Sequence, residues 1–131
     1  TKCGLTAEKI YTRPLFAYEA FKLFIEFLDR HCNKYDKKDK MQFIAYNATF
    51  DEEAIYRWFN LTDDHFYGSY FFRPSICLYR AVAWLLRNER VINKFTLANV
   101  CAFAEVEFND DDAHDAMYDI RKTVELYRRL V

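Results

Sequence analysis

The sequence predicts a helix-rich α/β fold, and two observations carry this prediction. The 131 residues are 52% apolar and contain only two Gly and two Pro, which is typical of an ordered globule with few chain breaks. One short apolar run, residues 42–46, leads directly into a helical pattern, as a buried strand leads into a helix. The length suits a single domain, and no linker divides residues 1–131.

Two helices and one strand are expected in the first half of the chain. Residues 1–14 should form a loop. A helix over residues 16–33 is predicted by an apolar stripe formed by Ala17, Ala20, Phe21, Phe24, Leu28 and Cys32. The charged segment 35–40 should be a solvated loop, and the strand at residues 42–46 follows it. A second helix over residues 52–60 should have an apolar side formed by Ala54, Ile55, Trp58 and Phe59.

The next part of the chain is expected to be mostly helical. Residues 61–69 should form a loop, and a short strand at residues 70–72 should end at Pro74. Helices are predicted over residues 75–88 and 95–103, the second with an inward face formed by Leu97, Val100 and Cys101.

A last helix is predicted to reach Leu130. The acidic run at residues 109–112 is expected to cap the start of this helix. The apolar spacing predicts a buried stripe formed by Ala113, Ala116, Met117, Ile120, Val124 and Tyr127.

Composition and charge narrow the classes of function. The net charge of −1 argues against a protein that coats long nucleic acid. Four scattered Cys without a Cys-x-x-Cys pair argue against a disulfide framework or a zinc site, and favour a reduced, cytoplasmic location. No apolar run approaches the roughly 18 residues that span a bilayer, so no membrane is expected. Aromatic residues make up 19% of the chain, and most of the 13 Phe should fill the core. The alternative is exposed apolar patches that favour a homodimer.

The first candidate motif is Tyr-Asn-Ala-Thr-Phe-Asp at residues 46–51. It follows the apolar strand and precedes a helical pattern, so it places the carboxylate of Asp51 at the carboxyl end of a strand. Asp51 is therefore a candidate metal ligand. The alternative is a helix N-cap, which is a common role for an Asp between a strand and a helix.

The second candidate motif, Ala-His-Asp-Ala-Met-Tyr-Asp at residues 113–119, places His114 five residues ahead of Asp119. On a regular helix the two side chains would point about 140° apart. His114 must therefore lie on a loop or a frayed first turn if both are to reach one phosphate. An imidazole titrates near neutral pH and suits a general base. The alternatives are a surface His and an Asp at a solvated helix edge.

Two carboxylates and one His from distant segments suit the metal-assisted hydrolysis of a phosphodiester. Two divalent ions about 4 Å apart neutralise the phosphoryl oxygens and lower the pKa of a bound water. Because carboxylates supply hard oxygen ligands, the ions expected are Mg²⁺ or Mn²⁺.

The two motifs resemble the second and third motifs of the DEDDh 3′–5′ exonucleases, which include the proofreading epsilon subunits of bacterial DNA polymerase III. The likeness extends to Gly4-Leu5-Thr6 with Ile10, and to Lys94-Phe95-Thr96-Leu97. It implies a ribonuclease H-like fold and release of nucleotides from single-stranded 3′ ends, with DNA as the expected substrate. A polymerase subunit is a candidate partner.

The resemblance also implies roles for individual residues. Asp51 and Asp119 match two of the family's four metal-binding acids, and His114 matches its general base. Asn47 is implied to lie near the substrate backbone, and Phe50 to help shape the site. Packing in the core is the alternative for Phe50.

The family's first motif, Asp-x-Glu on an opening strand, is not found. The only Asp-x-Glu is Asp51-Glu52-Glu53, which belongs to the second motif. We therefore expect the C-terminal two-thirds of an exonuclease domain, helix-rich because opening strands are missing and inactive by itself. The alternative is a non-catalytic module that binds nucleic acid or a polymerase on a degenerate exonuclease scaffold. The sequence does not separate DNA from RNA as the substrate.

Overall fold

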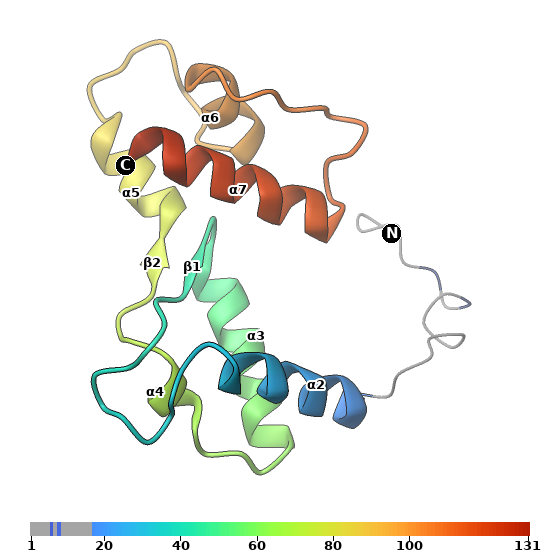
Figure 1. Cartoon of the computed structure of the whole chain (residues 1–131). Coiled ribbons are helices and arrows are strands. Elements are labelled where there is room, and N and C mark those ends of the chain that lie inside the picture. Colours follow the sequence, from blue (N-terminus) through green and yellow to red (C-terminus); the bar gives the residue numbers. More distant parts are fainter. Residues whose placement is uncertain (1–5, 7, 9–16) are drawn as a thin grey trace. The chain divides into compact units, whose positions relative to one another are not determined.

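A computed structural model describes Thr6, Glu8 and residues 17–131. It shows a helix-rich α/β chain with one small sheet (Figure 1). The predicted loop at residues 1–14 lies outside the described residues, Thr6 and Glu8 excepted, as does the predicted helix start at residue 16.

The chain divides into two compact units. We name them after their buried side chains. The aromatic unit contains residues 17–44 and 48–76, and the aliphatic unit contains residues 45–47 and 77–131. The expectation of one domain, which rests on chain length, stays a prediction.

The described helices of the aromatic unit are α2 (Ala17–Asp29), α3 (Ala48–Leu61) and α4 (Tyr67–Tyr70). α2 ends before its predicted end at residue 33, because the N–H of Arg30 bonds to two carbonyls at once and the chain closes into turns. α3 begins earlier than predicted, and Ala54 is exposed rather than inward-facing. α4 replaces part of the predicted loop at residues 61–69, because its first and last side chains are both buried.

Aromatic rings form the core of the aromatic unit. Its buried side chains are Phe21, Leu28, Cys32, Phe59, Tyr67, Tyr70 and Phe71. Phe21 meets Trp58 and Phe59 edge to face, with ring centroids 5.2 and 5.0 Å apart. Such pairs are worth about 0.5–1.5 kcal/mol beyond the area that they bury. The predicted stripe is confirmed at Phe21, Leu28 and Cys32, which are buried, whereas Ala17 is exposed.

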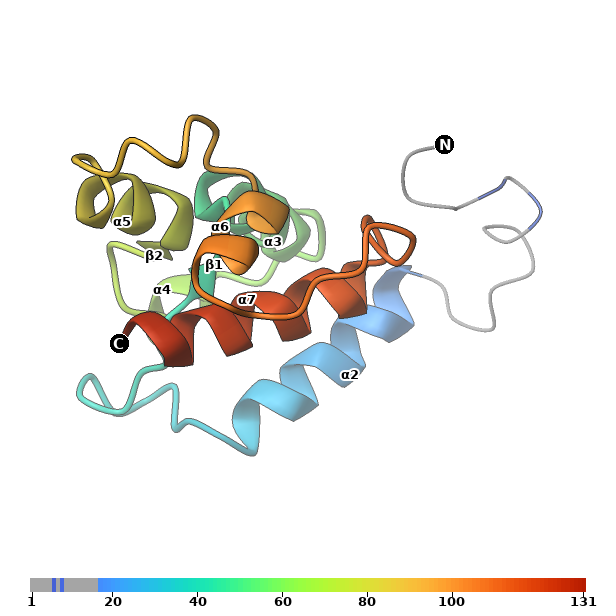
Figure 2. The ribbon, with the colours of Figure 1, turned by 90° about the horizontal axis from the view of Figure 1, so that it is seen from above.

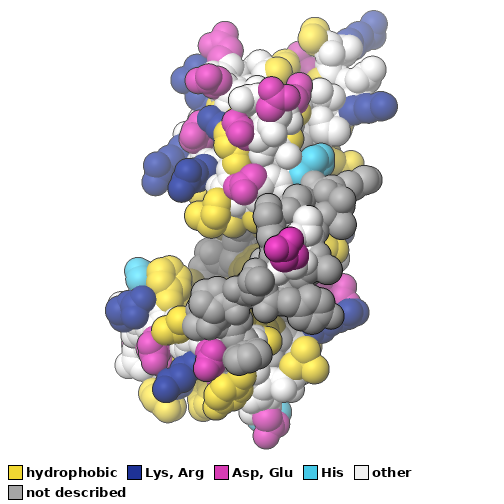
Figure 3. All heavy atoms as spheres, turned by 90° about the vertical axis from the view of Figure 1, so that its right-hand side faces the viewer, with side chains coloured by type: hydrophobic (Ala, Val, Ile, Leu, Met, Phe, Trp, Pro, Cys, Tyr) yellow, Lys and Arg dark blue, Asp and Glu magenta, His cyan; other side chains and the backbone are white. Residues whose placement is uncertain are grey.

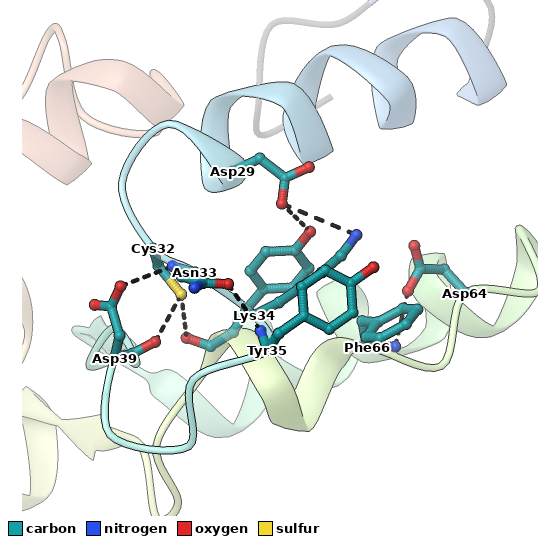
Figure 4. A network of polar contacts seen from close by, with 9 residues as sticks. Asp29, Cys32, Asn33, Lys34, Tyr35, Asp39, Asp64 and Phe66 are labelled. Atoms are coloured by element: carbon teal, nitrogen blue, oxygen red, sulfur yellow. Dashed lines mark hydrogen bonds and ion pairs between the residues drawn. The ribbon is translucent and has the colours of Figure 1, made fainter.

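Side chains organise the charged loop that follows α2 (Figure 4). The carboxylate of Asp39 accepts a hydrogen bond from the backbone N–H of Asn33 at 2.8 Å. The carbonyl of Asp39 accepts one from Cys32 Sγ at 3.0 Å. The N–H of Tyr35 donates to the side chain of Asn33 at 3.1 Å. The segment 35–40 is therefore a loop, as the sequence predicts.

An aromatic cage surrounds the ammonium group of Lys34. Its Nζ lies 4.6 Å from the ring centre of Phe66 and 5.6 Å from those of Tyr35 and Tyr70. Asp29 Oδ1, 4.0 Å from this Nζ, also accepts a hydrogen bond from the Tyr70 hydroxyl at 2.5 Å (Figure 4). Burial and the nearby carboxylate raise the pKa of Tyr70 above its ordinary value. The cage ties the loop to α2 and α4.

The sheet contains two short parallel strands, β1 (Ile44–Ala45) and β2 (Ile76–Cys77). A separate parallel bridge joins Met41 to Phe71. β1 is shorter than the predicted strand at residues 42–46. The predicted strand at residues 70–72 is reduced to the bridge at Phe71, because Tyr70 ends α4.

A two-residue bulge interrupts the pairing between the bridge and β2. The carbonyl of Met41 accepts the N–H of Phe72 at 2.9 Å. In an unbroken parallel ladder, residue 74 would donate the next hydrogen bond, to the carbonyl of Phe43. Residue 74 is Pro74, which has no N–H to donate. Ile76 donates to Phe43 instead, at 2.8 Å. Pro74 and the residue before it are therefore left out of the ladder.

The described helices of the aliphatic unit are α5 (Leu78–Leu85), α6 (Leu97–Phe103) and α7 (Ala116–Leu130). Its buried hydrophobic side chains are Leu78, Val82, Val100, Cys101 and Leu126. α6 packs against α7 (Figures 1 and 2). α5 is shorter than predicted because its first predicted turn contains β2. Val100 and Cys101 are buried as predicted, and Leu97 is half-buried.

α7 buries a different face from the predicted one. Thr123 and Leu126 are buried, although the predicted stripe contains neither. Met117, Ile120 and Val124 belong to that stripe, yet they are 56%, 54% and 41% exposed. The apolar side chains of α7 form a band around the helix that is wider than the face buried in the core. Periodicity reveals this band, but it does not show which part of the band is buried.

The surface carries both signs of charge. On the face seen in Figure 3, acidic and basic side chains are interspersed, and apolar side chains reach the surface among them. Cys32, Cys77 and Cys101 are free thiols, and burial raises the pKa of Cys101 to about 11. Among the described residues, no helix combines the length and the apolar character needed to span a membrane.

Candidate functional site

The first motif forms the junction between β1 and α3. β1 ends at Ala45, and α3 begins at Ala48 after a short turn. Asn47 is therefore the last residue before the helix, and it is exposed. Ala48 is buried and anchors the helix start. Asn47 thus lies beside the first-turn N–H groups, which have no partner within the helix.

Asp51 lies inside the first turn of α3. Because the helix begins at Ala48, Asp51 is not its N-cap, and that alternative is wrong. Partial burial raises the pKa of its carboxyl, and a hydrogen bond to its own backbone lowers that pKa in part. Desolvation therefore disfavours the ionised form of Asp51, and a bound cation would compensate for this cost.

Phe50 is exposed at the start of α3. The side chain is 73% exposed, so the alternative that it packs in the core is wrong. An exposed ring next to a candidate metal ligand offers a flat surface for stacking.

Glu52 is a structural residue of this motif that sequence reasoning missed. Its carboxylate accepts hydrogen bonds from the hydroxyls of Tyr67 at 2.9 Å and Ser75 at 2.5 Å. These bonds hold the first turn of α3 against α4 and against the segment before β2. Burial and Glu52 raise the pKa of Tyr67. On a helical projection Glu52 lies on the same face as Phe59, which was predicted to face inward. That position could have revealed Glu52 as a residue with a structural role.

The second motif forms the turn before α7 and the first turn of that helix. Asp115 is the N-cap, since its side chain accepts the N–H of Tyr118 at 2.9 Å. The prediction that residues 109–112 cap this helix is therefore wrong. His114 lies outside the helix, with a φ of 74°, and is exposed. This is the placement off the regular helix that the spacing of His114 and Asp119 requires.

Asp119 is half-buried in the first turn of α7. Its N–H donates to the carbonyl of Asp115 at 2.9 Å, and its carbonyl accepts from Thr123 Oγ1 at 2.8 Å. The Asp119 carboxylate has no hydrogen bond or ion pair with any other residue that the structure describes.

The candidate residues are divided between the units. Asn47, His114 and Asp119 belong to the aliphatic unit, and Phe50 and Asp51 belong to the aromatic unit. Within the described part of the chain, no group of three or more His, Cys, Asp or Glu side chains is arranged to hold a metal. The two acids offer oxygen donors only, which fits Mg²⁺ or Mn²⁺ better than zinc.

A surface hollow of about 510 Å³ adjoins Asn47 in the aliphatic unit. Tyr79, Asn93 and Lys94 also line it. The hydroxyl of Tyr46 donates a hydrogen bond to the carbonyl of Phe95. The start of the first motif therefore lies against the 94–97 segment, which also carries the family resemblance.

Comparison with known proteins found two partial similarities. Ribonuclease T of Haemophilus ducreyi is 31% identical over 91 residues, which cover 67% of this chain and 38% of that protein. Ribonuclease T of Wigglesworthia glossinidia brevipalpis is 42% identical over 41 residues, which cover 31% of this chain and 19% of that protein. The chain thus matches well under half the length of either relative. No protein-family model and no solved structure matches it.

The two similarities support a relationship to exonucleases of the DEDDh type. Neither relative is an epsilon subunit, so the resemblance to that subunit stays a prediction. The structure is mixed α/β and rich in helices with a small parallel sheet, and the ribonuclease H-like fold stays a prediction as well.

Proposed function

We propose that this chain contributes part of the active site of a metal-dependent exonuclease that removes nucleotides from single-stranded 3′ ends. The observation that carries the proposal is the start of α7. His114 lies in a turn outside the helix, and Asp119 lies in the first turn with its carboxylate unpaired among the described residues. The two motifs and the partial similarity to two ribonucleases T support the same function.

Each candidate residue has a distinct task in this proposal. Asp51 and Asp119 would each hold Mg²⁺ or Mn²⁺, and such ions would neutralise charge and lower the pKa of a bound water. An imidazole nitrogen of His114 takes the proton from the attacking water. The amide of Asn47 contacts the substrate backbone, and the exposed ring of Phe50 stacks on a base.

Two of the four acids that the family resemblance implies, Asp51 and Asp119, are matched in this sequence. The chain by itself should therefore bind Mn²⁺ weakly and show no nuclease activity. Titration of the 131-residue chain with Mn²⁺ tests this point, and tight stoichiometric binding would contradict it.

The substrate is a single-stranded 3′ end of RNA or DNA. The name ribonuclease T, which both relatives carry, favours RNA, and the resemblance to polymerase subunits favours DNA. Single-stranded RNA and DNA oligonucleotides of one sequence, labelled at the 5′ end, distinguish the two. The full-length protein should produce a ladder of products shortened one nucleotide at a time.

Single substitutions in the intact protein test the catalytic roles. His114→Ala should lower the rate of cleavage by about 10²–10⁴-fold, because it removes the general base. His65→Ala is a matched control, since His65 is an exposed His that pairs with Asp63 at 3.1 Å and is not a candidate residue. Equal activity of both variants, or cleavage inside the strand, would refute the proposal. Binding of oligonucleotides without shortening would favour the non-catalytic module instead.

A further inference from the structure

The loop that carries His114 adopts a costly backbone conformation. In Figure 2 this loop runs from the end of α6 to the start of α7. The φ of His114 is 74°, in the left-handed region, which costs an ordinary residue about 1–2 kcal/mol. Contacts made by neighbouring residues must offset this cost. The hydrogen bonds of Asn109 and Tyr118 do so.

Asn109 organises the acidic half of the loop. Its side-chain oxygen accepts the N–H of Asp111 at 3.0 Å, and its side-chain amide donates to the carboxylate of Asp112 at 2.9 Å. Its carbonyl accepts the N–H of Asp112 at 3.1 Å. The N–H of Asp115 then donates to the carbonyl of Asp112 at 3.2 Å, across His114. The loop is thus a continuous series of turns.

Tyr118 ties this series of turns to α7. Its hydroxyl accepts the backbone N–H of Asn109 at 2.6 Å. Its ring meets Phe108 edge to face, with centroids 5.4 Å apart. Its own N–H donates to the side chain of Asp115. Tyr118 therefore contacts both ends of the segment in which His114 lies.

We propose that Tyr118 and Asn109 are positioning residues that set the location of the His114 imidazole relative to α7. The inference rests on the proposed function of His114 as the general base. Proton transfer needs the base within hydrogen-bond reach of the attacking water. A displacement of about 1 Å at such a group lowers the rate about 100-fold. The hydroxyl of Tyr118 thus acts on the reaction only through His114.

Tyr118→Phe removes the hydroxyl and keeps the ring that packs on Phe108. Tyr127→Phe is the matched control, because Tyr127 lies on the same helix and its hydroxyl bonds to no other described residue. Hydrogen exchange measured by NMR on the 131-residue chain should show faster exchange of the Asn109 amide in Tyr118→Phe, with shifted His114 resonances. The control should leave both unchanged. Unchanged exchange at Asn109 in Tyr118→Phe would overturn the inference.

Kinetics of the intact protein provide the second test. Tyr118→Phe should lower kcat about 10–100-fold with little change in KM. In the background of His114→Ala, the same substitution should cause no further loss, because the hydroxyl acts through the imidazole. Additive losses would overturn the inference. If the intact protein cleaves no 3′ ends at all, the proposed function fails, and the NMR result still decides whether Tyr118 positions His114.

Discussion

The two units hold their helices by different means. In the aromatic unit, rings meet edge to face around Phe59, and the hydroxyls of Tyr67 and Tyr70 bond to the carboxylates of Glu52 and Asp29. In the aliphatic unit, the buried core is made of Leu, Val and Cys side chains, and among the described residues edge-to-face pairs such as Phe108–Tyr118 lie only at its edge. Order in its loops comes from side-chain bonds to the backbone, as at Asp115.

This difference bears on the candidate residues. The first turn of α3, which contains Asp51, is held by core contacts, because Glu52 is bonded to two hydroxyls. His114 is oriented by a loop on the surface of its unit. We therefore expect substitutions in the aromatic core to change stability most, and substitutions around His114 to change its position with little change in stability.

The largest effect is expected in the aromatic core. Phe59→Ala should lower the free energy of unfolding by about 3–5 kcal/mol, because it removes a fully buried ring and leaves a cavity. Denaturant unfolding followed by Trp58 fluorescence, in a Trp84→Phe background, measures the change. Phe50→Ala in the same helix should change it by less than about 0.5 kcal/mol, since that ring is exposed. Similar losses in the two variants would remove the distinction between core and surface on α3.

The aliphatic core should give a somewhat smaller effect. Leu126→Ala should cost about 2–4 kcal/mol, since the side chain is fully buried against α5 and α6 residues. Ile120→Ala on the same helix should cost about 0.5 kcal/mol. Thermal unfolding monitored by circular dichroism compares the two variants. A larger loss for Ile120→Ala would mean that the face predicted from the sequence is the buried one after all.

The anchor of α3 should give an intermediate effect. Glu52→Ala leaves two hydroxyls without their acceptor and should cost about 1–3 kcal/mol. Glu53→Ala changes helix propensity equally but removes only an exposed ion pair with Arg57, worth about 0.3–0.5 kcal/mol. Urea unfolding of both variants at one pH gives the difference. Equal losses would show that the Tyr67 and Ser75 bonds do not stabilise the unit.

The smallest effect concerns the charge of Asp51. The pKa of this carboxyl is raised in the folded chain, so the folded state binds its proton more tightly and stability falls as pH rises through that pKa. Asp51→Asn should therefore raise stability slightly at pH 7, by no more than about 0.5 kcal/mol for an exposed group. The gain should vanish below the ordinary pKa of 3.8. A stability loss at pH 7 would show that the carboxylate is favoured by its surroundings.

Periodicity in the sequence predicted the existence and order of the long helices. It succeeded for α2, where one narrow stripe leads to Leu28 and Cys32. It was wrong for α7, where Met117, Ile120 and Leu126 belong to one broad apolar band. The covered half depends on where α6 packs, which is a tertiary contact that no local pattern contains.

The site was predicted in part, for a related reason. The angular argument placed His114 outside the helix, and the structure agrees. The cap was assigned to residues 109–112, although Asp115 supplies it, because every acid of that run has the right chemistry for a cap. The sequence did not decide whether Phe50 is exposed. The apolar pattern predicted a helix start at residue 52, whereas α3 begins at Ala48 and includes Phe50.

The bulge before β2 makes this segment tolerant of shortening. Removing one residue between Phe72 and Ile76 would leave a one-residue bulge, which strand pairing accommodates. Removing Arg73 together with Pro74 would place the N–H of Ile76 where an unbroken ladder has its next donor to the carbonyl of Phe43. Deletions of one or two residues in this segment should therefore leave β2 paired with β1.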